Sequence, residues 1–211
     1  MNEYRFETKS INAFVDQIVR LLGKGYFRCI RVRIPDHKDP RAVVDKVLGL
    51  YDVRQPRWRR ERRNLKASAA VHLVWFDRMF VLMLSKGRHD AIEADHHKNL
   101  LNLNRTALNV FGYSIKRDVR SRKTNIRLTP EVYRKVNAHM ATIAVWDSYR
   151  KAERLEREFR RLPYQPYAPV FGQLVSIVKK TNVLRKHRGF EAISVERSLR
   201  KFRSIQKVFV E

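Results

Sequence analysis

The chain has 211 residues, and its 46 Lys and Arg residues against 21 Asp and Glu residues give a formal net charge of +25. Such an excess favours a polyanionic partner, because basic side chains that neutralise phosphates release condensed counterions. The alternative is a highly charged surface that binds nothing. With 44% hydrophobic and 10% aromatic residues, the composition excludes a disordered basic tail and predicts one domain, or two small ones, with a buried core.

Membrane and cofactor signals are missing from the sequence. No apolar run approaches the roughly 20 residues that span a bilayer, no lipidation motif stands at either end, and the first ten residues do not resemble a signal peptide. We therefore expect a cytoplasmic protein without a membrane partner. The sequence has no glycine-rich nucleotide loop of the GxGxxG or GxxxxGKS/T type, and its one cysteine, Cys29, forms neither a disulfide framework nor a zinc site. No cofactor or metal is expected.

The first half of the chain alternates between helical and strand patterns of apolar residues. Ser10 is a candidate cap for the first helix, and Pro40 opens the second. A single buried helix is the alternative to the hairpin around Asp77 and Arg78, but the Val, Trp and Phe content favours strands. The predicted order is a helix over 10–22, a strand over 26–34, a helix over 41–51, strands over 71–76 and 79–84, a helix over 92–104 and a strand over 108–115.

The second half of the chain is predicted to be helical. Thr129 and Pro130 form a helix start signal, and the apolar spacing continues that helix to about Leu162. Acidic and basic residues alternate over 153–160, which predicts a salt-bridged solvent face. Two further helices are expected over 170–187 and from the cap Ser194 to about Phe209.

The order strand, helix, strand, strand, helix, strand is that of the split βαβ plan. We therefore expect an α+β protein with a ferredoxin-like, four-stranded antiparallel sheet followed by a helical C-terminal region. The predicted organisation is an N-terminal helix over 1–25, the split βαβ module over 26–123 with a basic loop over 54–64, and a region of three helices over 124–211.

An arginine-rich segment lies within the predicted loop. Guanidinium groups pair bidentately with phosphate and stack on bases, and an embedded tryptophan adds a stacking surface. The alternative is a solvated charge run. The residues predicted to contact nucleic acid here are Arg54, Arg57, Trp58, Arg59, Arg60, Arg62 and Arg63.

Three other basic surfaces are candidates for the same role. Arg31 and Arg33 are expected on an open sheet face, where Phe111 and Tyr113 would stack on bases unless they belong to the core. The last helix is either a recognition helix or a packed basic surface helix. The remaining predicted contacts are Lys116, Arg117, Arg120, Arg122 and Lys123 after the last strand, and Arg197, Arg200, Lys201 and Arg203 on the last helix.

The enzyme alternative is a metal-dependent nuclease that nicks DNA in plasmid replication or transfer. Such a site needs two histidines at alternate strand positions and a helical tyrosine. His72 stands alone on its strand, and the adjacent His96 and His97 diverge by about 100° on a helix. The helical tyrosines Tyr133 and Tyr149 are expected to pack, so no catalytic residue is predicted.

The sequence therefore predicts a protein that binds DNA or RNA mainly through the phosphate backbone. We expect a non-catalytic component of a replication, DNA-transfer or ribonucleoprotein complex, with further protein partners possible there. The two alternatives that stay open are the nicking nuclease and a scaffold subunit that binds an acidic protein partner.

Overall fold

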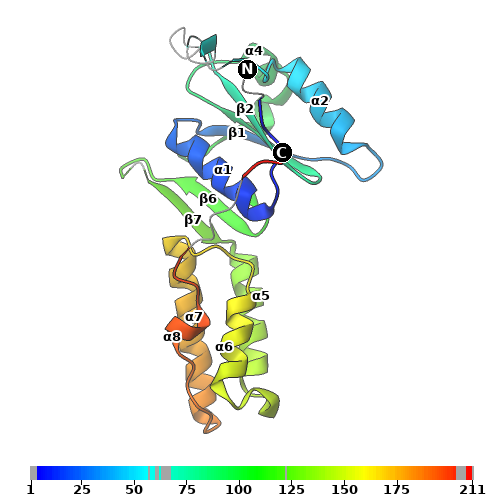
Figure 1. Cartoon of the computed structure of the whole chain (residues 1–211). Helices are drawn as coiled ribbons and strands as arrows, with labels where there is room; N and C mark the ends of the chain where they lie inside the picture. The colour runs from blue at the N-terminus through cyan, green and yellow to red at the C-terminus, as the bar shows by residue number, and fades with distance from the viewer. Residues whose placement is uncertain are drawn as a thin grey trace. The chain divides into compact units, whose positions relative to one another are not determined.

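The computed structural model describes residues 4–56, 58, 59, 62, 68–121, 123–202 and 208–210 (Figure 1). The chain divides into two compact units, one of Met1–Leu108, Lys116–Thr124 and Gln206–Glu211 and the other of Asn109–Ile115 and Asn125–Ile205. Together they contain a four-stranded antiparallel sheet, a three-stranded sheet and a set of C-terminal helices. The predicted α+β class is confirmed.

The four-stranded sheet belongs to the first unit. It consists of β1 (Arg28–Arg33), β2 (Val71–Phe76), β3 (Met79–Leu84) and β4 (Leu101–Asn102), in the order β2-β3-β1-β4. The hairpin of β2 and β3 is confirmed with the predicted bounds. Its turn contains Asp77 at a φ of 51°, in the left-handed region that Asp tolerates better than most residues, so no glycine or asparagine is needed.

Two predicted helices of this unit are confirmed, the first with its predicted cap Ser10 and the second with a cap, Asp39, that the sequence analysis did not name. In α1 (Ile11–Gly23), the Ser10 hydroxyl accepts a hydrogen bond from the Ala13 N–H at 3.1 Å. In α2 (Pro40–Leu50), the Asp39 carboxylate accepts from the N–H groups of Arg41 and Ala42. Each cap satisfies N–H groups that have no partner inside the helix. α2 then packs on one face of the sheet through Val44 and Leu48, which join the core around Ile30, Leu73 and Leu82.

The helix predicted over 92–104 is wrong beyond its first half. α4 (Asp90–His96) and the 3-10 turn η1 (His97–Asn99) are followed by β4, which pairs with Arg28 and Cys29 of β1. The Leu103 N–H then donates to the Phe27 carbonyl at 2.7 Å. Leucines at 100, 101 and 103 fit both the helical and the strand spacing of apolar residues. Backbone hydrogen bonds to the free edge of β1 therefore decide the conformation here.

The strand predicted over 108–115 is also corrected. It is two strands, β5 (Leu108–Val110) and β6 (Tyr113–Arg117), which form a separate sheet of order β5-β6-β7 with β7 (Thr124–Leu128). Phe111 and Gly112 have φ values of 46° and 81° and form the two-residue turn between β5 and β6. The segment predicted to be the fourth strand of the four-stranded sheet thus belongs to the three-stranded sheet. The region from residue 124 onward, predicted to be helical throughout, begins with strand β7.

The helices of the second unit are α5 (Pro130–Ala144), α6 (Ala152–Arg161), α7 (Ala168–His187) and the short α8 (Val195–Ser198). The Thr129 cap of α5 is confirmed, since its hydroxyl accepts from the Val132 N–H at 3.4 Å. The single helix predicted to reach Leu162 is wrong, because the 3-10 turn η2 (Asp147–Tyr149) separates α5 from α6. α5 packs along α7, and α6 lies beside α8 (Figure 1).

The helix predicted from Ser194 to Phe209 is largely wrong. Ser194 does cap α8, but Leu199 is already extended. Further on, the Lys9 N–H donates to the Val208 carbonyl at 3.1 Å, and Thr8 and Phe209 form an antiparallel bridge. Strand-like pairing with the N-terminal segment therefore replaces helix at the C-terminal end. None of the helices in the described part of the chain is both long and apolar enough to cross a membrane.

Candidate nucleic-acid interface

The arginine-rich segment lies partly outside the described residues, which exclude Arg57, Arg60 and Arg63. Of its described members, Trp58 is 57% exposed, and the guanidinium carbon of Arg59 lies 5.5 Å from the centroid of the Trp58 ring. Arg62 is exposed as well. The Trp58–Arg59 pair thus presents a cation and a ring together, the combination on which bases and phosphates bind.

Arg54 contacts residues of its own unit that lie outside the arginine-rich segment. Its guanidinium forms an ion pair with Asp45 at 2.7 Å and lies 5.9 Å from the centroid of the Phe6 ring. A phosphate ligand would have to compete with both contacts. Arg54 is therefore a weaker candidate than the sequence suggested.

The face of the four-stranded sheet that carries Arg31 and Arg33 is not the open platform that the sequence predicted. Both arginines are exposed, as expected. Their neighbours on the same face, Cys29, Val81 and Met83, are however fully buried, and α1 packs over this side of the sheet against β2. Bases have no flat surface to stack on here. Arg31 and Arg33 remain candidates for phosphate contacts only.

The two aromatic residues proposed for that platform also lie elsewhere. Phe111 is in the β5–β6 turn. Tyr113 is 1% exposed, and its hydroxyl accepts a hydrogen bond from the Gln165 N–H at 2.9 Å. Tyr113 is therefore a core residue, one of the two alternatives that the sequence left open. Neither Tyr113 nor Phe111 lies on the sheet face where stacking on bases was predicted.

A basic loop connects β6 and β7. The Asp118 carboxylate folds it by accepting from the N–H groups of Arg120 and Ser121 at 2.8 and 2.9 Å, and these bonds lower the pKa of Asp118. The Asp118 N–H in turn donates to the Lys123 carbonyl. Because its one acid is occupied by backbone N–H groups, the loop displays cations. The cations predicted to contact nucleic acid in this region are Lys116, Arg117, Arg120 and Lys123, together with Arg122, which lies outside the described residues.

The predicted cations near the C-terminus are brought beside arginines of α6. Arg197 and Arg200 are exposed, as is Lys201, whereas Arg203 lies outside the described residues. Because α8 lies beside α6, these side chains extend a row of arginines on α6. We call this set the α6–α8 basic surface; its members are Arg154, Arg157, Arg160, Arg161, Arg197, Arg200 and Lys201.

The predicted salt-bridged face of α6 is wrong in most of its pairs. Arg161 pairs with Glu158 at 2.9 Å, but Glu156 is buried and its carboxylate instead accepts from the Ser194 N–H at 2.8 Å. Arg157 makes no hydrogen bond or ion pair with any described residue. Burial of Glu156 therefore leaves α6 with more unpaired cations than its sequence implied.

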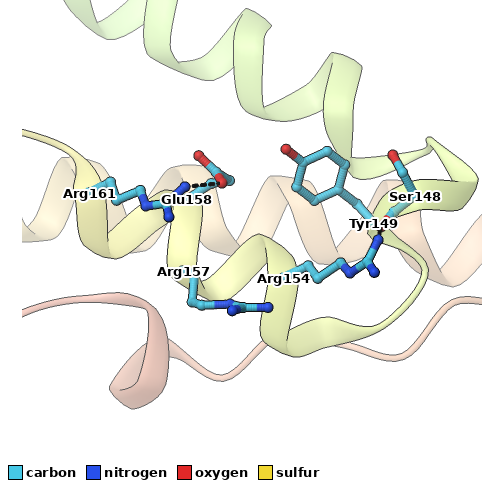
Figure 2. Close-up of a pocket in the computed structure, with 6 residues that line it drawn as sticks. All are labelled: Ser148, Tyr149, Arg154, Arg157, Glu158 and Arg161. Carbon is cyan, nitrogen blue, oxygen red and sulfur yellow. Dashed lines mark hydrogen bonds and ion pairs between the residues drawn. The ribbon is translucent and has the colours of Figure 1, made fainter.

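Two hollows in this surface are lined by the arginines. The first, of about 410 Å³, is lined by residues of both α6 and α8: Glu153, Glu156, Arg157, Arg160 and Arg197. A second of about 290 Å³ lies between α6 and the η2 turn; Figure 2 shows its lining and the ion pair of Arg161 with Glu158. Planar guanidinium groups around an open hollow suit phosphate oxygens, which they bind bidentately.

A buried arginine on α7 fixes the turn beside the second hollow. Arg185 is completely buried, and it donates to the carbonyls of Tyr149 at 2.7 Å, Arg150 at 2.8 Å and Ala144 at 3.3 Å. It also donates to the Glu191 carbonyl at 2.6 Å. Burial lowers its pKa, opposed by the nearby carboxylates of Glu191 and Glu156. Arg185 thus satisfies the carbonyl groups that the α5–α6 break leaves open.

The histidines of the nuclease alternative make contacts inside the first unit. His72 has its Nδ1 3.2 Å from the Tyr4 hydroxyl and its ring edge-on to Tyr26. His96 has its Nε2 2.8 Å from the Tyr51 hydroxyl, which donates to Asp95 at 3.0 Å. Burial and the Asp95 carboxylate raise the pKa of Tyr51 to about 12, so its hydroxyl stays neutral.

Two other potentially reactive side chains are Cys29 and Tyr133. Burial raises the pKa of the Cys29 thiol to about 12, so it is not a nucleophile at neutral pH. The Ser176 hydroxyl at 3.5 Å and the Lys180 ammonium at 3.4 Å lower the pKa of Tyr133, because both can donate a hydrogen bond to its ionised oxygen. Within the described ranges, no three His, Cys, Asp or Glu side chains are grouped to hold a metal ion.

Comparisons with protein-family models and with curated proteins give no match to this chain. Sequence reasoning missed the α6 arginines because the acids among them suggested internal pairing. Their signal was the spacing of Arg154, Arg157, Arg160 and Arg161, which places them on adjoining turns of one helix.

Proposed function

We propose that this protein binds nucleic acid, mainly through the phosphate backbone. It serves as a non-catalytic component of a replication, DNA-transfer or ribonucleoprotein complex. Binding uses the α6–α8 basic surface, with the β6–β7 loop and the Trp58–Arg59 pair as further contacts. The net charge of +25 adds long-range attraction for such a ligand.

One observation carries this proposal: the α6–α8 basic surface contains more cations than its own acids neutralise, since only Arg161 and Lys201 among its seven members form ion pairs with described residues. Glu158 and Glu196 are each paired, with Arg161 and Lys201. Glu156 is buried and bonded to backbone. Arginines that outnumber the carboxylates around them repel one another, and a phosphate chain relieves that repulsion. A surface of this kind fits a polyanion better than a neutral partner.

We propose further that the first unit follows the ferredoxin-like, split βαβ plan. In support, its described elements run β1, α2, β2, β3, α4, β4 along the chain, and its strands lie in the order β2-β3-β1-β4. The plan serves proteins of many functions, so it adds nothing to the nucleic-acid argument by itself.

The test replaces Arg157, Arg160 and Arg197 with alanine in the full chain. Fluorescence anisotropy with labelled single-stranded DNA, double-stranded DNA and RNA is measured across salt. Each lost phosphate contact lowers the slope of log K against log salt by about 0.7–0.9, so we expect a slope smaller by about 2–3 units. The affinity at low salt should fall by at least tenfold.

The matched control replaces three exposed basic residues of α5 and α7 that lie outside this surface: Arg134, Lys179 and Lys186. This triple variant has the same net charge as the test variant. If both variants lose affinity equally, the charge acts without a defined site and the proposal of this surface fails. If the unmodified protein binds none of the three ligands at low salt, the nucleic-acid function itself is refuted.

A further inference from the structure

We propose that the turn between α5 and α6 is a stacking platform for an unpaired base, so that single-stranded nucleic acid is the preferred ligand. This inference rests on the proposed function and makes it more specific. It concerns Trp146 and Tyr149, two aromatic residues that lie within the single helix predicted from Thr129 to about Leu162.

Trp146 is exposed where the fold gives it no core to fill. It stands directly before η2, and 51% of its surface is accessible. Its ring centroid lies 6.4 Å from that of Tyr149 at an angle of 46°. Tyr149 is half-buried and lies tilted against the indole, about half of which faces solvent. Tryptophan exposed in this way is typical of binding sites.

Cations lie next to Tyr149, the half-buried member of this aromatic pair. Tyr149 lines the hollow of about 290 Å³ together with Arg154, Arg157 and the ion pair of Arg161 with Glu158, so its cations outnumber its one acid (Figure 2). A nucleotide strand could therefore place a base on the rings and its phosphates on the guanidinium groups, which is how single-strand binders work. Asp147 is exposed beside Trp146, and this single acid makes the turn less favourable for a phosphate than the α6 side.

The platform is preorganised by hydrogen bonds to its backbone. The Trp146 N–H donates to the Ile143 carbonyl at 3.2 Å, and the Tyr149 N–H donates to the Trp146 carbonyl at 2.9 Å. Arg185 holds the Tyr149 carbonyl from inside, and Arg154 donates to the Ser148 carbonyl at 2.9 Å. A turn fixed in this way loses little conformational entropy when a base stacks on it.

The geometry distinguishes single strands from duplexes. In a duplex the faces of the bases are stacked on one another, and only the phosphates and groove edges are accessible. An exposed indole gains from stacking only where a base is unpaired. Phosphate contacts alone would not separate the two ligands, so the preference for single strands depends on Trp146.

Tryptophan fluorescence tests this inference directly. A Trp58→Phe variant retains Trp146 as the exposed indole of the described residues, while Trp75 is buried at 6% exposure and gives a constant background. This variant is titrated with a 15-nucleotide single strand and with the matching duplex. We expect the single strand to quench the fluorescence and the duplex to leave it nearly unchanged.

The companion measurement is anisotropy of the Trp146→Ala and Trp146→Phe variants. Alanine should weaken single-strand binding by roughly 5- to 150-fold, the factor that corresponds to about 1–3 kcal/mol for one stacked base, and phenylalanine should restore part of it. Binding of the duplex should not change in either variant. Because Trp146 is largely exposed, an unchanged thermal unfolding curve verifies that the fold is intact.

The outcomes separate this inference from the proposed function. Equal affinity for single strand and duplex, with unquenched fluorescence and no effect of Trp146→Ala, overturns the platform and leaves phosphate binding in place. Absence of binding to either ligand at low salt overturns both. Quenching by the duplex as strong as by the single strand also overturns the preference, because it shows that Trp146 responds to nearby charge and not to an unpaired base.

Discussion

Replacing Arg185 with methionine tests the central contact of the second unit. Methionine keeps much of the apolar stem of the side chain but removes every N–H donor. Four carbonyl groups lose their partner, those of Ala144, Tyr149, Arg150 and Glu191. Because three of them belong to the break between α5 and α6, the substitution should loosen this break rather than α7 itself.

The magnitude follows from the surroundings of these carbonyls. The bond to Ala144 is buried, and a buried acceptor left without a donor costs about 1–3 kcal/mol. The other three bonds are partly buried, so water can replace the donor and each contributes about 0.5–1.5 kcal/mol. Removing the buried charge returns part of this sum, since its desolvation cost disappears. We expect the free energy of unfolding to fall by about 3 kcal/mol.

Urea unfolding followed by circular dichroism measures this loss. The control is Lys186→Met, the same change of charge at an exposed neighbour in the same helix, which should shift the midpoint very little. Arg185→Lys should fall between the two, because an ammonium group reaches fewer of the carbonyls. If the urea midpoint of Arg185→Met equals that of Lys186→Met, Arg185 does not stabilise the break between α5 and α6.

Two further substitutions probe smaller contacts, one in each unit. Arg28 donates to Glu93 at 2.7 Å and lowers the pKa of its carboxyl, so the ion pair stabilises the fold above the ordinary pKa of Glu and is lost as the pH falls through the lowered value. Glu93→Gln should therefore be less stable than the parent at neutral pH, with the difference closing at acid pH; a difference that is constant with pH in urea titrations contradicts this. The Gln173 amide accepts from the Leu128 N–H at 2.8 Å and donates to the Leu128 carbonyl at 3.3 Å. Gln173→Leu should therefore lower the free energy of unfolding by about 1–2 kcal/mol and increase amide hydrogen exchange at Leu128. Unchanged exchange would show that the contact is not formed in solution.

Elements with strong local signals were predictable from the sequence alone. Ser10, Asp39 and Thr129 begin helices because their side chains satisfy the first N–H groups, an interaction that spans only three residues. The hairpin of β2 and β3 follows from an apolar run rich in Val, Trp and Phe that Asp77 and Arg78 interrupt. In each case the residues that decide the conformation are neighbours in the chain.

Elements that depend on distant partners were not predictable in the same way. Leu101 becomes part of β4 because β1, about 70 residues earlier, has a free edge that accepts it. The break between α5 and α6 is held by Arg185, which comes from the next helix but one. A periodicity of apolar residues reports which side is buried, but it does not report which backbone groups find a partner across the fold.

The same division applies to the candidate site. The sequence alone determined a strongly basic chain with enough apolar residues for a core, since charge and composition do not depend on the fold. Only the tertiary structure decided which cations are free. Glu156 looked like a partner for the arginines of α6, yet it turns inward to the Ser194 N–H, while Trp146 turns outward. Pairing and exposure depend on what lies across from a side chain, and segments far away in the chain supply that.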